Sequence, residues 1–271
     1  HGQIGQVTAQ GNIGGGMMTS QIVDISLLRM MASYGFVLVV LALIRLKRIG
    51  LGRDLVTAVI RMTVQLIVMA FILEMIFDMS LWYVVIAMEM AIFILASRIV
   101  LSRVKAKTRN LSRNILISLL LGAGSIMAFF IVIIVGPDPL YDPRYVIPLG
   151  GMIIGNSMNA CAIAFERFHS LMKKDRKLIL TLLSLGATST EATSSQFKEA
   201  LKAAFLPILI TMTATGMVIL PGMMTGQILS GTSPLTAVKY QIAIMMGITS
   251  SNALVAYLIL YLENGEFFNN K

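Results

Sequence analysis

The sequence predicts an all-α integral membrane protein with about seven transmembrane helices, and three observations lead to this fold class. Hydrophobic residues make up 56% of the chain and charged residues 13%, whereas an ordinary soluble domain has about 45–50% and about 25%. Several apolar runs reach the ~20 residues that a helix needs to cross a ~30 Å hydrocarbon layer. The basic residues gather in three loops between these runs. This pattern is typical of helices in a bilayer.

Seven apolar runs form the predicted spans. In chain order they cover about residues 25–44, 55–77, 81–97, 115–135, 146–165, 203–220 and 240–262. We interpret residues 1–16 as an expression scar, because they lack an initiator Met and are rich in Gly and Gln. A processed native terminus is the alternative. Residues 17–271 then form a single transmembrane domain.

The Lys and Arg residues predict the orientation of the chain. Seventeen of the 22 lie in three loops, at 45–53, 98–113 and 167–202, whereas the opposite loops hold only Arg144 and Lys239. By the positive-inside rule the three basic loops are cytoplasmic. We therefore expect the N-terminus outside and the C-terminus in the cytoplasm. The net charge of +9 marks this topology, and no nucleic-acid partner is expected.

The sequence lacks the motifs of an ATPase or of a hydrolase. The pattern G-x-x-x-x-G-K-[ST], which cradles ATP phosphates, is absent, so this chain is not expected to bind or hydrolyse ATP. The only histidines are His1 and His169 and the only cysteine is Cys161, which argues against nucleophilic catalysis and a zinc site. No catalytic residue and no cofactor are expected here. A membrane hydrolase that uses a carboxylate or a metal is an alternative without positive support.

The long connection between the fifth and sixth spans, at about 168–202, has a helical pattern of its own. Leu178, Leu182 and Leu185 recur at helical spacing and predict an amphipathic helix that ends at Gly186. Thr188 with Glu191 three residues later predicts a capping box that opens a second helix. A helix–Gly–helix element of this kind suits a partner groove; a solvated interfacial hairpin is the other interpretation.

Polar residues inside the second and third spans form a second group of candidates. Arg61 and Glu89 lie at similar depths, roughly 10 and 13 Å from the cytoplasmic end at the helical rise. Gln65 follows Arg61 by four residues and shares its helix face. We expect Arg61 and Glu89 to form an ion pair that fixes two helices, in preference to a transport site, because a neutralised pair leaves little for a substrate.

The fifth span carries candidates for packing or for a cation path. Gly151 and Gly155 have the small-xxx-small spacing that lets helices approach, and Asn156 and Asn159 can hydrogen-bond across them. Packing at a dimer axis is one interpretation, and a path lined by amide oxygens is the sharper one. The chain also has 20 methionines, which fill gaps or ligate soft metals. The candidate metal ligands are Met152, Met158, Met217, Met223 and Met224.

Four segments resemble a known family. They are VIPLGGMIIGNSMNA (146–160), LSLGATSTEA (183–192), LPGMMTGQILSGTSPLTAVKYQI (220–242) and, more weakly, RMTVQLI (61–67). They are similar to the Fet-type iron-export permeases of bacteria, to which plant permeases of aluminium tolerance are related. The resemblance covers nearly all of Met17 to Leu262.

The resemblance implies the transmembrane permease subunit of an ABC transporter in the bacterial plasma (inner) membrane. Two copies would join two ATPase subunits, which would hold ATP and Mg, and the substrate would be a metal ion, iron first. The cytoplasmic motif Gly corresponds to Gly186, so the segment 178–190, with Thr188, would dock the ATPase. It departs from the importer pattern, because Leu180, Thr181 and Leu182 stand where importers have Glu-Ala-Ala. A self-sufficient channel, a secondary transporter and a permease for a lipid or metal complex stay open as alternatives.

Overall fold

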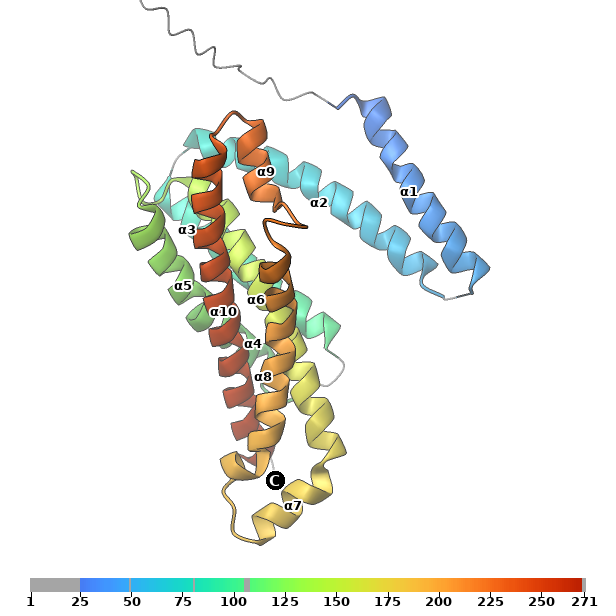
Figure 1. Cartoon of the computed structure of the whole chain (residues 1–271), viewed down its shortest axis with the longest axis vertical. Helices are drawn as coiled ribbons and strands as arrows, with labels where there is room; N and C mark the ends of the chain where they lie inside the picture. Colours follow the sequence, from blue (N-terminus) through green and yellow to red (C-terminus); the bar gives the residue numbers. More distant parts are fainter. Residues whose placement is uncertain (1–24, 49, 80, 105–107, 270–271) are drawn as a thin grey trace, which may run out of the picture.

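The computed structural model describes residues 25–269 apart from 49, 80 and 105–107, and every regular element in this part is a helix (Figure 1). The predicted scar at 1–16 lies outside the described residues. The elements, with η for π-helical segments, are α1 (Leu27–Leu46), α2 (Gly52–Met79), α3 (Trp82–Arg103), α4 (Leu111–Ser118), η1 (Leu119–Ala123), α5 (Gly124–Phe129), η2 (Phe130–Val135), α6 (Pro143–Lys174), α7 (Arg176–Ser184), α8 (Ser189–Ala214), α9 (Gly222–Leu229) and α10 (Pro234–Asn269).

Six helical segments are long and apolar enough to cross a bilayer, and they confirm the all-α, multi-span fold class. They coincide with the first five predicted spans and the seventh. The segments are Leu27–Leu46, Gly52–Met79, Trp82–Arg103, Leu111–Val135, Pro143–Lys174 and Pro234–Glu266.

The predicted sixth span, 203–220, is not one continuous helix. α8 starts in the polar segment at Ser189, runs through Pro207 and ends at Ala214. Residues 215–221 are irregular, and α9 begins after Pro221, in a segment predicted to be a loop. Two features break the helix: Gly216 has φ of 90°, and Pro221 has no backbone N–H to donate. The chain thus returns across the bundle in two pieces, α8 and α9 (Figure 1).

The long helix α6 is central to the core, where it packs against α3, α8 and α10. Its side chains Ile153, Ile154 and Phe165 are almost completely buried. The π-helical segment η1 approaches α10 unusually closely, because a Cβ at Gly122 would lie 2.6 Å from Val255 Cγ2 and 2.9 Å from its backbone N. Only glycine fits at this contact. Close packing of this kind is how helices associate in a membrane.

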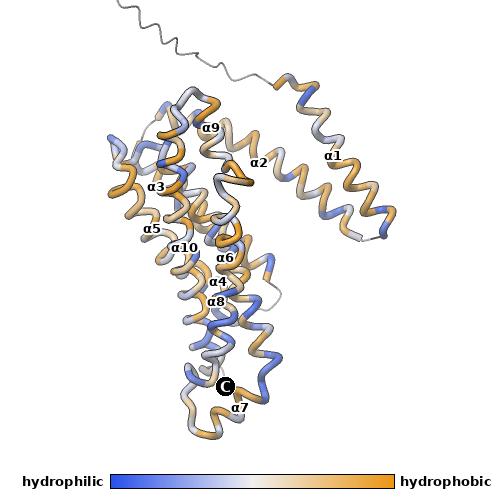
Figure 2. Tube along the Cα trace, in the orientation of Figure 1, coloured by the Kyte–Doolittle hydropathy of each residue, from blue (hydrophilic) through white to orange (hydrophobic). Residues whose placement is uncertain are grey.

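The hairpin of α1 and α2 stands away from the rest of the bundle (Figure 1). α1 has no buried residue, and α2 has one, Ile76. A hydrogen bond of 2.8 Å between Tyr34 and Thr63 joins the two helices. Figure 2 shows that the hairpin is largely hydrophobic along its length. Such a surface needs lipid or another protein around it.

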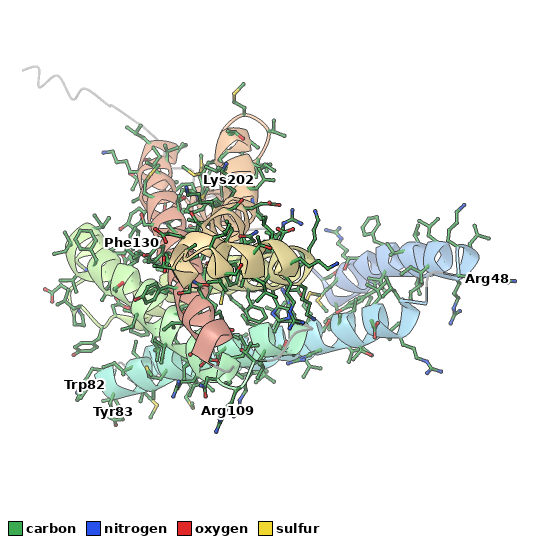
Figure 3. All side chains as sticks on the ribbon, turned by 90° about the horizontal axis from the view of Figure 1, so that it is seen from below. Arg48, Trp82, Tyr83, Arg109, Phe130 and Lys202 are labelled. Atoms are coloured by element: carbon green, nitrogen blue, oxygen red, sulfur yellow. The ribbon has the colours of Figure 1, made fainter. Side chains whose placement is uncertain are left out.

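Exposed aromatic residues and basic residues mark different parts of the molecule. Trp82 and Tyr83, at the start of α3, are more than half exposed, as expected of the aromatic residues at a membrane interface. Figure 3 places Arg48 at the far end of the α1–α2 hairpin, apart from Arg109 and Lys202 on the main bundle. The end of α10 and α7 both lie at the lower end in Figure 1, and the α9–α10 turn lies at the other end.

Candidate functional site

Three asparagines meet at a small polar cavity between α6, α8 and α10. Asn156 and Asn159 on α6, Asn252 on α10 and Thr211 on α8 line about 90 Å³ of space. The sequence singled out Asn156 and Asn159, and the structure brings them to one cavity. Asn252 and Thr211 were missed, because they come from helices far away in the chain.

In two of these side chains, Asn156 and Thr211, the hydrogen bonds leave an oxygen atom that can receive a ligand. Asn156 Nδ2 donates to the Met152 carbonyl at 2.8 Å, so the oxygen of the Asn156 side-chain amide takes no part in this bond. Thr211 Oγ1 donates to the Pro207 carbonyl at 3.0 Å, so its lone pairs are its remaining capacity. Oxygen atoms are the ligands that hard cations prefer.

Pro207 also lines this cavity and changes the backbone of α8. Proline has no N–H, so the carbonyl of Ala203, four residues earlier, loses its usual helical donor. Ala203 directly precedes Ala204, which forms part of the cavity wall together with Pro207. Backbone carbonyls released in this way are common in transporter helices.

A buried network ties the cavity to the core. Ser157 and Ser251, both fully buried, share a short hydrogen bond between their hydroxyls. Ser157 Oγ also donates to Asn252 Oδ1 at 3.4 Å. These contacts hold α6 against α10 and fix the orientation of the Asn252 amide. The sequence does show a cluster of small polar residues, TSSNA at 249–253. Nothing in this segment indicates which helix its side chains contact.

Arg103 contacts one of the asparagines that line the cavity. It ends α3, and its Nη1 donates to Asn159 Oδ1 at 3.1 Å. Arg103 and Asn159 are both exposed. The guanidinium therefore occupies the amide oxygen that a cation would need and adds a positive charge beside it.

The predicted Arg61–Glu89 pair does not form. Glu89 is 5% exposed, and among the described residues neither of its carboxylate oxygens has a hydrogen-bond partner. It lies against Gly150 on α6, where a Cβ would be 2.6 Å from Oε1. Arg61 and Gln65 are exposed on α2. Equal depth does not bring the two charges together, because α2 diverges from the bundle.

The candidate methionines lie elsewhere. Met152, Met158 and Met223 pack against the hydrophobic core, and neither they nor Met217 and Met224 line the asparagine cavity. Met217 is 92% exposed. In the described part of the chain, no group of three or more His, Cys, Asp or Glu residues could hold a metal ion.

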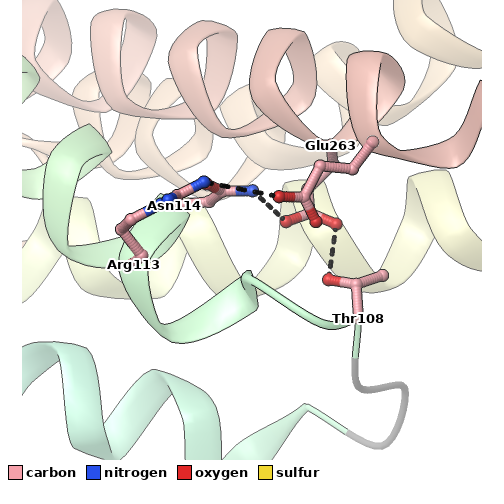
Figure 4. A network of polar contacts seen from close by, with 5 residues as sticks. Thr108, Arg113, Asn114 and Glu263 are labelled. Atoms are coloured by element: carbon pink, nitrogen blue, oxygen red, sulfur yellow. Dashed lines mark hydrogen bonds and ion pairs between the residues drawn. The ribbon is translucent and has the colours of Figure 1, made fainter. Parts of the chain in front are cut away.

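A second polar network, which sequence reasoning missed, lies at the lower end of the bundle (Figure 4). Glu263 on α10 accepts hydrogen bonds from Thr108 Oγ1 and from Asn114 Nδ2, each 2.9 Å long. Arg113 approaches Glu266 at 3.9 Å. A cavity of about 640 Å³ opens beside them, between α4, α8 and α10. The network anchors the start of α4 to the end of α10.

The helix–Gly–helix element has the local geometry that the sequence predicts. α7 covers Arg176–Ser184, and Gly186 turns the chain with φ of 91°. Thr188 caps α8: its hydroxyl accepts from the Glu191 N–H, and the Glu191 carboxylate accepts from the Thr188 N–H at 2.8 Å. The latter bond lowers the pKa of the Glu191 carboxyl. The leucine ridge consists of Leu178, Leu182 and Leu185. Leu178 is 56% exposed and Leu185 79%, and Leu182 is half-buried.

α8 is firmly seated in spite of its exposed start. Gln196 Nε2 donates to Asp175 at 2.9 Å, which ties α8 to the junction of α6 and α7. Thr193 Oγ1 donates to Asn264 at 3.0 Å, which ties it to α10. A single helix thus connects the Gly186 turn to Pro207 and Thr211 at the cavity.

Comparison with known proteins gives a consistent picture. The model of the uncharacterised protein family UPF0014 matches residues 27–268. The chain is 32% identical to the UPF0014 membrane protein slr1647 of Synechocystis, over 84% of this chain and 88% of that one. It is 29% identical to the probable iron export permease protein FetB of Escherichia coli, over 83% and 85%. It is also 29% identical to the protein ALUMINUM SENSITIVE 3 of Arabidopsis thaliana, over 82% and 80%.

No solved structure matches the chain. The family match covers most of the described helices, including the asparagine cavity and the Gly186 turn. The chain therefore belongs to the UPF0014 family of membrane proteins.

Proposed function

We propose that this chain is the permease subunit of an ABC transporter and exports metal ions, with iron as the first candidate. The observation that carries the proposal is the continuity of α8, which begins at the exposed Gly186 turn and lines the asparagine cavity with Thr211. A movement of the turn would be transmitted along this one helix to the cavity wall. The name of the FetB relative, a probable iron export permease, supports metal as the substrate class.

The energy for transport comes from a separate ATPase in this proposal. Two ATPase subunits, with ATP and Mg bound to them, would receive the ridge of Leu178, Leu182 and Leu185. Exposed leucines on a short helix outside the spans suit a hydrophobic cleft in a partner. The permease chain itself is not an enzyme.

A second copy of the chain would complete the path. Arg61 and Gln65 are exposed in the middle of α2, and a charge that faces lipid is costly. Irregular backbone at membrane depth is tolerated only where protein or water covers it, and Met217 and Val218 in the break after α8 are 92% and 84% exposed. A homodimer that covers these surfaces satisfies both requirements.

The proposed orientation follows the positive-inside rule. The basic segments at 45–53, 98–113 and 167–202 face the cytoplasm, so the N-terminus lies outside and the C-terminus inside. The bacterial plasma membrane is the proposed location. α7 and its leucine ridge then face the compartment that holds ATP.

The decisive experiment is transport into inside-out vesicles, prepared with and without the partner ATPase and scanned over metal ions. ATP-dependent uptake of iron, or of another metal, only with both subunits supports the proposal. Uptake without ATPase and driven by an ion gradient would identify a channel or secondary transporter instead. ATP turnover stimulated by a lipid and not by any metal would reassign the substrate class.

A further inference from the structure

The turn between α1 and α2 forms a cavity of about 850 Å³ with a strongly basic rim. Arg45, Arg48 and Arg53 line it, and none of the described residues that line it is acidic. The tight turn brings these side chains together: Arg48 has φ of 50° and Gly50 has φ of 78°. Three guanidinium groups around one cavity fit a phosphate, which accepts several hydrogen bonds from Arg.

A second cavity continues this one along the hairpin. It has about 490 Å³, is lined almost entirely by apolar groups, and shares Leu41 and Val56 with the basic cavity. Gly35 forms part of its wall, and a Cβ there would have no atom within 4 Å. The two cavities thus form one groove with a cationic end and an apolar end.

The groove lies on a face that the rest of the chain leaves open. α1 has no buried residue, and Figure 1 shows the hairpin apart from the main bundle. On α2 the groove residues Arg53, Val56 and Ile60 are turned by about 120–180° from Gln65 and by about 80–140° from Arg61, at 100° per residue. The face that we assign to the second copy is therefore a different one.

We propose that the α1–α2 groove binds an anionic phospholipid of the bilayer. Its phosphate lies among Arg45, Arg48 and Arg53, and an acyl chain lies in the apolar groove between Gly35 and Val56. A lipid matches both ends of the groove, because its phosphate complements the basic end and its acyl chain the apolar end. A free phosphate would occupy only the basic end. Basic pockets between helices on the cytoplasmic side of membranes bind lipid headgroups of this kind. The proposed orientation places this lipid in the cytoplasmic leaflet. Lipid binding itself depends neither on that orientation nor on the proposed transport function.

The test uses the purified full chain in a neutral detergent. Phosphatidylglycerol and phosphatidylcholine are titrated separately, and retained lipid is counted by native mass spectrometry while the thermal unfolding midpoint is followed. Phosphatidylglycerol is expected to stay bound and to raise the midpoint, and phosphatidylcholine to do neither. Equal retention of the two lipids would overturn the proposal.

The role of the arginines is tested by a matched pair of triple variants. R45Q/R48Q/R53Q is expected to weaken phosphatidylglycerol binding roughly 100-fold, because each basic residue near an anionic headgroup contributes on the order of fivefold in affinity. R98Q/R109Q/K174Q removes the same charge from exposed positions outside the groove and should bind nearly as the parent chain does. Equal loss in both variants would show a general attraction of basic loops for anionic lipid and no built site.

The acyl-chain part of the site has its own test, which also serves if the arginine variant does not fold. Gly35→Phe fills the apolar groove and should displace phosphatidylglycerol, whereas Gly35→Ala should keep it. Inorganic phosphate and glycerol phosphate are added as chain-free ligands and should leave the unfolding midpoint unchanged. Unchanged lipid binding by Gly35→Phe, or an equal effect of inorganic phosphate, would contradict a lipid site.

Discussion

Arg103 Nη1, at the end of α3, donates a hydrogen bond of 3.1 Å to Asn159 Oδ1 on α6, at the edge of the asparagine cavity. The bond joins the end of α3 to α6, which together with α8 supplies most of the cavity lining. It also places a positive charge beside Asn159. In the proposed transport path, Arg103 would act as a latch that competes with a cationic substrate for the Asn159 oxygen.

Arg103→Gln is predicted to raise metal transport at low metal concentration. An exposed charge contact is worth about 0.2–1 kcal/mol, so the expected gain is about two- to fivefold. Initial rates of uptake into inside-out vesicles measure it. Arg98→Gln is the control, because Arg98 is also exposed near the end of α3, whereas the hydrogen bond to Asn159 Oδ1 comes from Arg103. A latch is excluded if the two variants transport alike.

The contact of Glu89 with Gly150 predicts an effect on stability. Gly150→Ala puts a Cβ 2.6 Å from Glu89 Oε1 and 2.7 Å from Oε2, and overpacking of a buried site costs about 1–3 kcal/mol. The unfolding midpoint of the purified chain should fall accordingly. Gly151→Ala is the matched control, since a Cβ at Gly151 meets nothing within 4 Å.

Glu89→Ala should rescue the Gly150→Ala variant, because it removes the group with which the new methyl collides. The expected result is a double variant that unfolds at a higher temperature than Gly150→Ala alone. A double variant no more stable than the single one would mean that the strain has another source.

The asparagine cavity predicts that one of two similar threonines matters for transport. Thr211 lines the cavity, and Thr213, two residues later on α8, is exposed and bonds only to its own helix, at the Leu209 and Ile210 carbonyls. Thr211→Val keeps the shape and removes the oxygen, so metal transport should fall while expression stays normal. Thr213→Val should transport as the parent chain does. Equal transport by both variants would remove Thr211 from the path.

The sequence could predict those parts of the fold that local chemistry determines. The capping box of Thr188 and Glu191 needs only two residues three apart, and the turn at Gly186 needs only a residue that accepts positive φ. The break after α8 was also within reach, because Gly216 and Pro221 are both helix breakers. Apolar composition masked it, since the run 203–220 reads as one span.

Contacts between distant helices were beyond the sequence. Asn252 lies close to Asn156 only because α6 and α10 pack together, and no local pattern specifies that pairing. The Arg61–Glu89 expectation failed for the same reason: depth in the membrane is set by position along a helix, but helix rotation and tilt are set by packing. Glu89 instead lies against a glycine, which only the structure could reveal.

The coupling role of the Gly186 turn is tested by Gly186→Val. Gly186 has φ of 91°, which a β-branched residue rarely adopts, whereas a Cβ at this position meets no atom within 4 Å. Valine is therefore disfavoured at position 186 by the backbone conformation and not by a steric clash. Because the change is confined to the turn, helix insertion and dimerisation should be normal. The altered turn should move Leu178 and Leu185 of the leucine ridge away from the ATPase subunit, and metal transport should be lost.

Co-purification with the ATPase and ATP turnover of the reconstituted complex measure the Gly186→Val defect. Gly186→Asn is the conservative comparison, because Asn tolerates positive φ better than Val does, so it should retain more of the coupled activity. Leu185→Ala removes an exposed side chain of the ridge without changing the turn, and it should weaken ATPase binding alone. If Gly186→Val binds the ATPase and transports metal as the parent chain does, then the turn has no part in coupling, and α7 is an interfacial helix whose leucines face lipid.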